Sequence, residues 1–182
     1  LQAALAYNLS QLLPEDLEVS FFAVSGAESV EAAIKLSTMA KDKGAKYFIS
    51  ATEGYHGKTL GALSLTDTEN FSEGFHVGLP KENTKKIEYN NIQAYKDIIT
   101  KLSKEKIIAI IIEPIQGQIV EVAKKDYLKE ICAISKKNDI AVIFDEIKCG
   151  LGRSGNLFSF LDHECVPDIV TTSKALGGGK NA

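Results

Sequence analysis

Six consecutive apolar residues, Ile107 to Ile112, form the longest hydrophobic run in the chain. A strand with one face in water alternates apolar and polar residues, so an unbroken run indicates a strand that is covered on both faces. The residues from Ile140 to Phe144 have the same character. Because crossover helices cover both faces of a parallel sheet, these runs predict a layered α/β architecture with a largely parallel sheet.

Helix and strand patterns alternate along the whole chain. The predicted fold class is therefore α/β, a three-layer α/β/α arrangement. Residues 67–86 are polar and weakly patterned, and we expect them to run over the surface. Gly44 is the expected C-cap of the second helix. The predicted helices are residues 1–13, 28–42, 91–103 and 126–137, and the predicted strands are residues 19–24, 46–50, 107–113, 140–145 and 168–172.

Composition restricts the class of partner. A net charge of -3 at pH 7 gives no bulk attraction to nucleic acid or to an anionic membrane. The run from Ile107 to Ile112 is too short to span a bilayer. The three cysteines show no CxxC spacing, and their odd number favours a reducing, cytoplasmic location. We expect a small-molecule partner, and neither nucleic acid nor a membrane.

The sequence Ser25-Gly26-Ala27-Glu28 fits a capping box, with Ser25 at the start of a helix and Glu28 three residues further on. An ordinary helix start explains this pattern. The same geometry also suits phosphate, because free N–H groups and the helix dipole favour an anion at this end. Gly26 would let the backbone approach such a ligand closely.

Two further residues lie at predicted strand ends, where ligands bind in parallel sheets. Asp145 closes an apolar run, and its carboxylate either caps a turn or keeps a pyridine nitrogen protonated. Lys174 lies between a strand end and the glycines at 177–179, where its amine could form a Schiff base. An anion for a ring nitrogen, an amine and a phosphate-binding helix start are together what pyridoxal phosphate requires from a protein.

A loop bounded by Gly54 and Gly57 carries Tyr55 and His56. Tyr55 is either a core aromatic residue or a flat ring that stacks on a flat cofactor. His56 is more often a hydrogen-bond partner behind such a cofactor than a catalyst.

Rival motifs fail on their spacing. The sequence Gly177-Gly178-Gly179-Lys180 resembles the end of a P-loop, but that motif needs Gly where Lys174 stands and Ser or Thr where Asn181 stands. His163-Glu164-Cys165 lacks the second histidine of a zinc-binding helix, so no metal site is predicted. No GxSxG nucleophile elbow occurs in the sequence.

Several blocks, in a fixed order, resemble the class III (omega) aminotransferases of pyridoxal-phosphate fold type I. The resemblance extends from about Leu5 to Lys180. Its blocks are Ser-Gly-Ala-Glu at 25–28, Tyr-His-Gly-Lys-Thr at 55–59, Glu-Pro-Ile-Gln-Gly at 113–117, Asp-Glu-Ile at 145–147, Gly-Leu-Gly-Arg-Ser-Gly at 150–155 and Ser-Lys-Ala-Leu-Gly-Gly-Gly at 173–179.

The resemblance implies pyridoxal 5'-phosphate as the cofactor and a role for each candidate. Asp145 would pair with the ring nitrogen, and Lys174 would form the Schiff base and then carry a proton, so these two residues are the catalytic ones. Backbone N–H groups would hold the phosphate, and Tyr55 would stack on the ring. The implied cofactor-binding set is Ser25, Gly26, Ala27, Tyr55, His56, Asp145, Lys148 and Lys174.

The resemblance also implies an assembly and a domain plan. The family is usually a homodimer with active sites near the subunit interface. The chain begins at Leu1 and stops just after a glycine cluster, so both ends look cut. We expect residues 1–182 to be an incomplete large domain that binds pyridoxal phosphate, with an N-terminal segment and a small C-terminal domain outside it.

Three positions depart from the family pattern. Lys148 stands where the family often has Gln beside the phenolic oxygen of the cofactor. Gln118 stands where the ornithine and aminobutyrate branches have Glu, and Lys58 stands where the acetylornithine branch has a substrate-binding Arg. The sequence is therefore assigned to neither branch.

The predicted function is an aminotransferase that moves an amino group between an amine or amino acid and a keto acid or aldehyde. An aminomutase or epimerase on the same scaffold is the enzymatic alternative, because it would use the same residues. A catalytically inactive α/β fragment is the alternative from another class.

Overall fold

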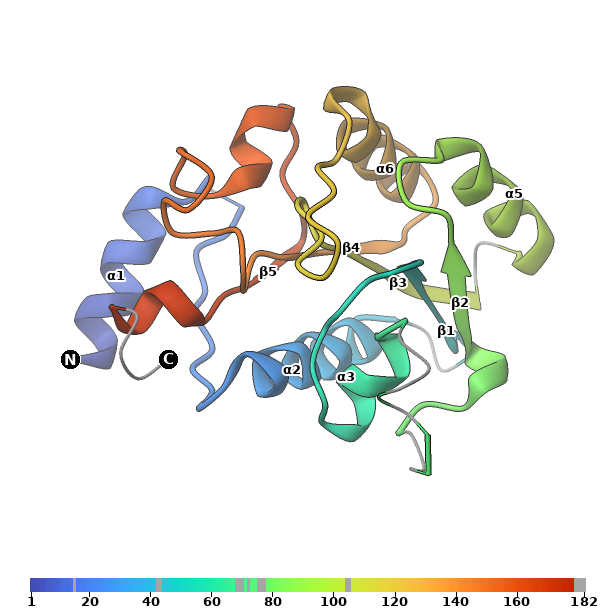
Figure 1. Cartoon of the computed structure of the whole chain (residues 1–182), viewed down its shortest axis with the longest axis horizontal. Coiled ribbons are helices and arrows are strands. Elements are labelled where there is room, and N and C mark those ends of the chain that lie inside the picture. The colour runs from blue at the N-terminus through green and yellow to red at the C-terminus, as the bar shows by residue number, and fades with distance from the viewer. Residues whose placement is uncertain are drawn as a thin grey trace.

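A parallel sheet forms the centre of the computed structural model, which describes residues 1–14, 16–41, 44–67, 71, 73–74, 78–103 and 106–178 (Figure 1). Five strands make up this sheet in the described part of the chain, in the order β2-β1-β3-β4-β5, and every pair is parallel. The predicted α/β class with a parallel sheet is confirmed. The strands are β1 (Tyr47–Ala51), β2 (Thr84–Ile87), β3 (Ile107–Ile112), β4 (Ala141–Asp145) and β5 (Ile169–Thr171).

Helices cover the sheet on both faces, as Figure 1 shows. α2 (Gly26–Met39) and α3 (Leu60–Leu65) pack on one face, where Val30 and Leu65 belong to the same buried cluster as Ile111. α5 (Ile92–Leu102) and α6 (Lys125–Lys137) pack on the other face. This is the expected three-layer arrangement. The remaining helices are α1 (Gln2–Leu12) and the short 3-10 helices η1 (Lys81–Asn83), η3 (Ser159–His163) and η4 (Lys174–Gly177).

The outer helices form because apolar residues recur at helical spacing. In α6 the buried residues Leu128, Ile131 and Ser135 lie on one face, three or four positions apart. The hydroxyl groups of Tyr95 on α5 and Ser135 lie 2.7 Å apart and join the two helices inside the core. Asn91 begins α5, and its side chain accepts a hydrogen bond from the N–H of Ala94.

The strand predicted at residues 19–24 is wrong. This segment is extended but belongs to no sheet, and the side chains of Val19 and Val24 are 94% and 93% exposed. It runs along a groove of about 1860 Å³ that is also lined by α1, α2, α6, β4 and β5. An apolar pattern indicates that a segment can be a strand, but a neighbouring strand must also supply hydrogen bonds, and none does so in the described residues. Ser25 is therefore not at the end of a strand.

The surface excursion predicted for residues 67–86 contains a strand that the pattern did not indicate. Residues 84–87 form β2, the outermost strand on its side of the sheet. An edge strand tolerates polar residues such as Lys85, so it lacks the apolar signal of a central strand. Residues 68–70, 72 and 75–77 of this prediction lie outside the described part of the chain.

The other boundaries differ by a few residues. α2 ends at Met39 with Ala40 as its C-cap, so Gly44 does not have the predicted role. Residues 42 and 43 lie outside the described part of the chain. α3 was not predicted, because its six residues are too few to show helical periodicity.

The strand order places a switch point between β1 and β3. After β1 the chain adds β2 on one side of it, and later adds β3 on the other side. The connections that leave β1 and β3 therefore run to opposite faces of the sheet, and in sheets of this kind ligands bind at the carboxyl ends of the strands beside the switch point. In the described residues no helix combines the length and the hydropathy needed to cross a membrane.

Lys86 allows a test of how the β2 edge is buried. Its amine donates to Ser50 Oγ at 2.8 Å. Burial lowers the pKa of this amine from 10.5 to about 8, although the negative charge of Asp67 acts to raise it. The unfolded chain then binds more protons than the folded one between these pH values, so this group makes the free energy of unfolding rise with pH in that window. Lys86→Met should remove that rise.

Urea unfolding of both proteins at about pH 7 and about pH 10 measures the effect. The free energy of unfolding of the unchanged protein should gain on that of Lys86→Met as the pH increases. Lys96→Met, at an exposed lysine, controls for the loss of one positive charge. An equal difference at both pH values would show that Lys86 titrates alike in the folded and unfolded states.

Candidate active site

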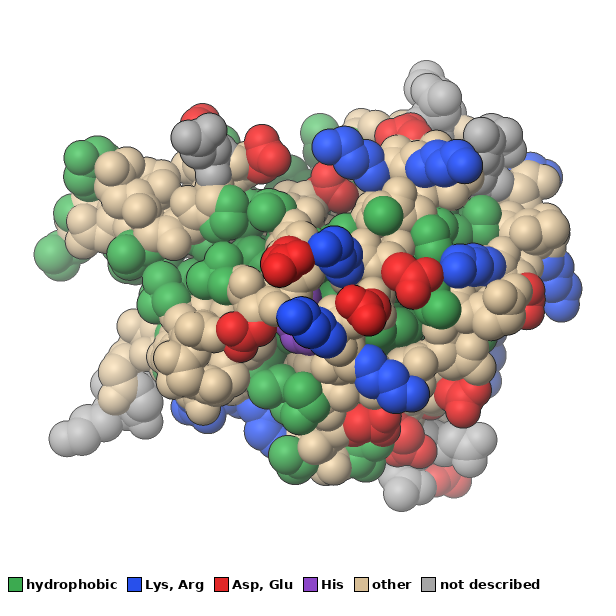
Figure 2. Space-filling model, turned by 90° about the horizontal axis from the view of Figure 1, so that it is seen from above, with side chains coloured by type: hydrophobic (Ala, Val, Ile, Leu, Met, Phe, Trp, Pro, Cys, Tyr) green, Lys and Arg blue, Asp and Glu red, His purple; other side chains and the backbone are tan. Residues whose placement is uncertain are grey.

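The candidate residues gather at one edge of the sheet, where β1, β3, β4 and β5 end. The arrowheads of β1 and β2 point upwards in Figure 1, and Figure 2 looks down on that side. Figure 2 shows acidic and basic side chains interleaved around histidine atoms near the middle of this face. Apolar side chains gather at its left, over α1.

Asp145 is the last residue of β4, and only 3% of it is exposed. Its Oδ1 accepts a hydrogen bond of 3.1 Å from the N–H of Ile147. Its Oδ2 lies 2.8 Å from Nδ1 of His56, which is 2% exposed. The structure thus places His56 directly against the carboxylate, while Nε2 on the far side of the ring has no hydrogen-bond partner among the described residues.

The predicted helix start at Ser25 begins α2. Ser25 Oγ accepts from the N–H of Glu28 at 3.3 Å, as in a capping box. The Glu28 carboxylate reaches back to the N–H of Val24 at 3.1 Å instead of that of Ser25. Within the described chain the N–H groups of Gly26 and Ala27 have no acceptor, because the first turn of a helix has none of its own.

Four of the six sequence blocks, those at 25–28, 55–59, 145–147 and 173–179, meet around the start of α2. A Cβ atom at Gly26 would lie 3.0 Å from Ile147 Cγ2 and 3.2 Å from Ser173 Cβ. Ile147 lies two residues after Asp145, and Ser173 lies one residue before Lys174. At Gly57 a Cβ atom would lie 2.7 Å from that of Ala27, so the loop with Tyr55 and His56 rests on the same turn.

Lys174 begins η4, and two residues separate it from the end of β5. It is partly buried, and its φ of 24° falls in the left-handed region that side chains rarely adopt. The N–H of Glu146 donates to Thr171 O at 3.0 Å and thereby joins the ends of β4 and β5. Strained backbone of the kind seen at Lys174 is often found at ligand sites.

Tyr55 lies in the loop after β1, and Lys148 lies in the turn after β4. The ring of Tyr55 packs edge-on against Phe71, with the ring centroids 5.6 Å apart. The amine of Lys58 lies 4.3 Å from the centroid of Phe71. Lys148 is exposed, and its amine donates to the carbonyl of Gly117 in the turn after β3.

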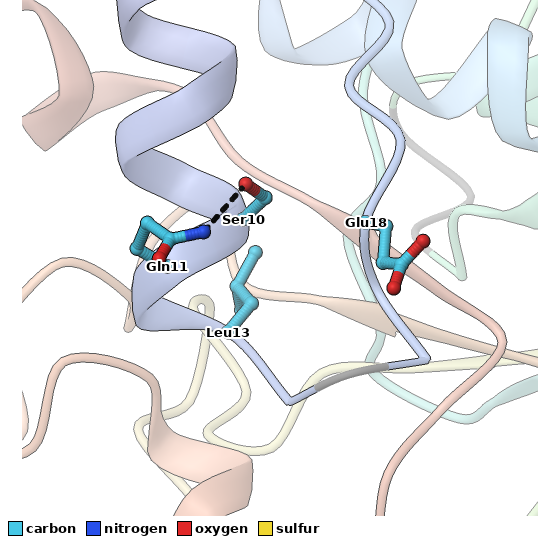
Figure 3. A pocket seen from close by; sticks show the side chains of 4 residues that line it. All are labelled: Ser10, Gln11, Leu13 and Glu18. Carbon is cyan, nitrogen blue, oxygen red and sulfur yellow. Dashed lines mark hydrogen bonds between the residues drawn. The ribbon is translucent and has the colours of Figure 1, made fainter.

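A second, smaller cavity lies away from this edge, between α1 and the extended segment that follows it. It measures about 560 Å³ and is lined by Ser10, Gln11, Leu13 and Glu18, which Figure 3 shows. Gln11 Nε2 donates weakly to Ser10 Oγ at 3.5 Å. These four residues include one carboxylate and no cation, and the Ser10 hydroxyl donates to the carbonyl of Tyr7 at 2.8 Å, so the cavity is no candidate for catalysis.

A family model described as aminotransferase class III matches residues 1–182. The chain belongs to the class III aminotransferase family. The acetylornithine aminotransferase of Methanocaldococcus jannaschii is 40% identical over 98% of the chain and 44% of its own length. The putrescine aminotransferase of Pectobacterium atrosepticum is 39% identical over 98% of the chain and 39% of its own length.

A solved structure supports the class III fold of this chain. The (S)-enantioselective omega-transaminase from Thermomicrobium roseum superposes with a TM-score of 0.91 at 30% identity, and the match covers 98% of this chain and 44% of that one. The chain therefore spans less than half the length of the class III proteins that it matches.

Glu113 lies in the candidate site, but the sequence assigned no role to it. It is 5% exposed and follows β3. Its Oε2 accepts from the N–H of Tyr55, and its Oε1 accepts from the N–H of Gly117, each at 2.9 Å. Burial raises the pKa of its carboxyl group, while the nearby His56 opposes that rise. Its position directly after the most apolar strand was the available signal, but the direction of its oxygens depends on the tertiary structure.

Gly57 provides a test of the contact with Ala27. Both Gly57 (φ +127°) and Gly152 (φ +90°) adopt backbone conformations that disfavour a side chain, but open space surrounds only Gly152. Gly57→Ala should therefore lower the free energy of unfolding by about 1–3 kcal/mol more than Gly152→Ala does, because it adds overpacking to backbone strain. Denaturant unfolding measures both values. Equal losses would mean that the loop does not press on α2.

Proposed function

We propose that the protein containing this chain is an aminotransferase dependent on pyridoxal 5'-phosphate. It would move an amino group between an amine or amino acid and a keto acid or aldehyde. The observation that carries the proposal is the close approach of Ile147 and Ser173 to Gly26, where an added Cβ atom would lie 3.0 Å and 3.2 Å from their side chains. This contact brings the start of α2, the loop after Asp145 and the residue before Lys174 to one point.

The residues present fit the cofactor in charge and in shape. The unpaired N–H groups of Gly26 and Ala27 and the dipole of α2 suit a phosphate. A Cβ atom at Gly26 would crowd Ile147 and Ser173, so only glycine leaves the backbone accessible there. Asp145 supplies the buried anion that a protonated pyridine nitrogen requires.

When bound, pyridoxal phosphate supplies an electron sink for the carbon that carries the amino group. Asp145 would hold a proton on the ring nitrogen, and His56 keeps the carboxylate in its orientation through Nδ1. The amine of Lys174 would tether the cofactor and carry a proton to and from the substrate carbon. Tyr55 would cover one face of the ring.

Lys148 is included among the proposed cofactor-binding residues, although it differs from the glutamine that is common at this position in the family. Its amine is bonded to the carbonyl of Gly117, so it lies at the turn after β3. From there it would face the phenolic oxygen of the cofactor as a cation, in the place of the glutamine that is common in the family. Ser25 would support the phosphate by fixing the first turn of α2.

The donor and the acceptor are proposed only as chemical classes. The two relatives are named for acetylornithine and for putrescine, which is a carboxylate-bearing amine in one case and a plain diamine in the other. We further propose a homodimer, a cytoplasmic location and, for residues 1–182, the role of an incomplete large domain. The free cysteines in the described residues are in keeping with a reducing compartment.

A donor screen on the protein that contains this chain tests the function. Each amine is added with pyridoxal phosphate bound, and the change of the visible spectrum is followed together with amino-group transfer to a keto acid. Transfer to the acceptor would support an aminotransferase. Isomerised product without transfer would indicate an aminomutase or epimerase, and no uptake of the cofactor would indicate an inactive α/β protein.

Lys174→Ala should abolish the visible absorbance of bound cofactor and its fixation to the chain by borohydride, because the tethering amine is gone. The exposed Lys96→Ala is the control and should retain both signals. If Lys174→Ala also retains both, another lysine is the tether, and Lys148 and Lys180 are then the residues to test.

Asp145→Asn should preserve much of the phosphate binding but slow proton abstraction by more than about a hundredfold, because a neutral amide no longer stabilises a proton on the ring nitrogen. The turnover number and the dissociation constant of pyridoxal phosphate separate the two effects. An unchanged turnover number would remove Asp145 from the mechanism.

A further inference from the structure

Two loops face each other across the β1–β3 switch point. One follows β1 and carries Tyr55, and the other follows β3 and contains Gly117. In the described residues the β1–β3 pairing ends at Ser50 and Ile111, so the sheet itself joins neither loop to the other. Side chains must therefore hold the loops in register.

Glu113 makes the most direct connection between them. One carboxylate oxygen accepts from the N–H of Tyr55 and the other from the N–H of Gly117, each at 2.9 Å. Both oxygens are thus used on backbone donors of different loops, in a place where only 5% of the residue is exposed. Charge-assisted bonds in such surroundings are stronger and better aligned than bonds in water.

Neighbouring contacts leave Glu113 little freedom. The hydroxyl of Tyr89 donates to Glu113 O at 2.8 Å, and Gln116 Nε2 donates to Thr52 O at 2.7 Å. At Gly117 a Cβ atom would lie 2.7 Å from Lys148 Cδ and 3.2 Å from Glu113 Oε1. The backbone of Gly117 is thus confined between the Glu113 carboxylate and the Lys148 side chain. The Lys148 amine donates a hydrogen bond to the carbonyl of Gly117.

We propose that Glu113 is the positioning residue that sets the place of Tyr55 over the cofactor ring, an inference that rests on the proposed function. Glu113 touches neither reacting atoms nor substrate in this account. It acts through the backbone of Tyr55, from whose N–H it accepts a hydrogen bond. Its second bond, to the N–H of Gly117, fixes the Tyr55 backbone relative to the turn that Lys148 also contacts.

Glu113→Gln is the test, because the amide has nearly the shape of the carboxylate but one accepting oxygen becomes an NH₂ group. That group would face an N–H donor, so one of the two bonds is lost. The dissociation constant of pyridoxal phosphate should rise about tenfold or more, in line with a lost bond to a charged acceptor. Without cofactor, the amide hydrogen of Tyr55 or Gly117 should exchange faster with solvent.

Glu146→Gln is the matched control. Glu146 is 1% exposed, and its Oε1 accepts from the N–H of Phe160 at 2.8 Å. Burial raises the pKa of its carboxyl group as it does for Glu113. It holds the first turn of η3 and makes no bond to the loop that carries Tyr55 within the described residues, so its loss should lower stability without raising the dissociation constant of the cofactor. If Glu146→Gln raised the dissociation constant as much as Glu113→Gln does, Glu113 would have only a general structural role, and the proposal would be overturned.

A double-mutant cycle with Tyr55→Ala decides whether Glu113 acts through Tyr55. In that background, Glu113→Gln should change the dissociation constant by less than about twofold, because the ring that it positions is absent. A retained tenfold effect would overturn the proposal. If Glu113→Gln does not fold, Glu113→Asp replaces it in the cycle, since its shorter side chain keeps the charge but cannot bridge both N–H groups. Failure of the unchanged protein to bind pyridoxal phosphate at all would overturn the proposed function and this inference with it.

Discussion

The central strand β3 is the constraint on which the other parts depend. All six of its residues are buried, and it pairs in parallel with β1 on one side and with β4 on the other. Parallel pairing makes the carboxyl ends of these strands finish at a common edge, and helices on both faces keep the sheet out of water. Glu113 and Asp145, the polar residues at the ends of β3 and β4, are brought to this edge although they are far apart in the sequence.

Burial at that edge determines what these carboxylates can do. Asp145 is satisfied by His56 and by the N–H of Ile147, and Glu113 by two backbone N–H groups of separate loops. A buried charge that loses its partner is costly, so such groups keep a single geometry. The same low dielectric strengthens the field that Asp145 exerts on a cation placed beside it. Packing of the sheet is thus the physical source of the electrostatics that the proposed chemistry needs.

The sequence predicted those parts whose signal is local. Continuous apolar runs located β3 and β4, helical spacing located α5 and α6, and the Ser25–Glu28 pattern located the start of α2. The strand predicted at residues 19–24 was wrong and β2 was missed, for one shared reason. Strand formation depends on a hydrogen-bonded neighbour, so an apolar segment without one stays outside the sheet, and a polar segment such as Thr84–Ile87 joins it by pairing with β1.

The sequence by itself determined the α/β class, the membership of the class III aminotransferases and the strand-end positions of Asp145 and Lys174, because periodicity, turn residues and ordered motifs are written in neighbouring positions. Only the tertiary structure decided that His56 lies against Asp145, that Glu113 joins the Tyr55 loop to Gly117, and that Lys148 bonds to that same turn. Apart from the short step from Glu113 to Gly117, these contacts join segments separated by many residues, and their distances follow from how the strands stack in space, which no local pattern contains.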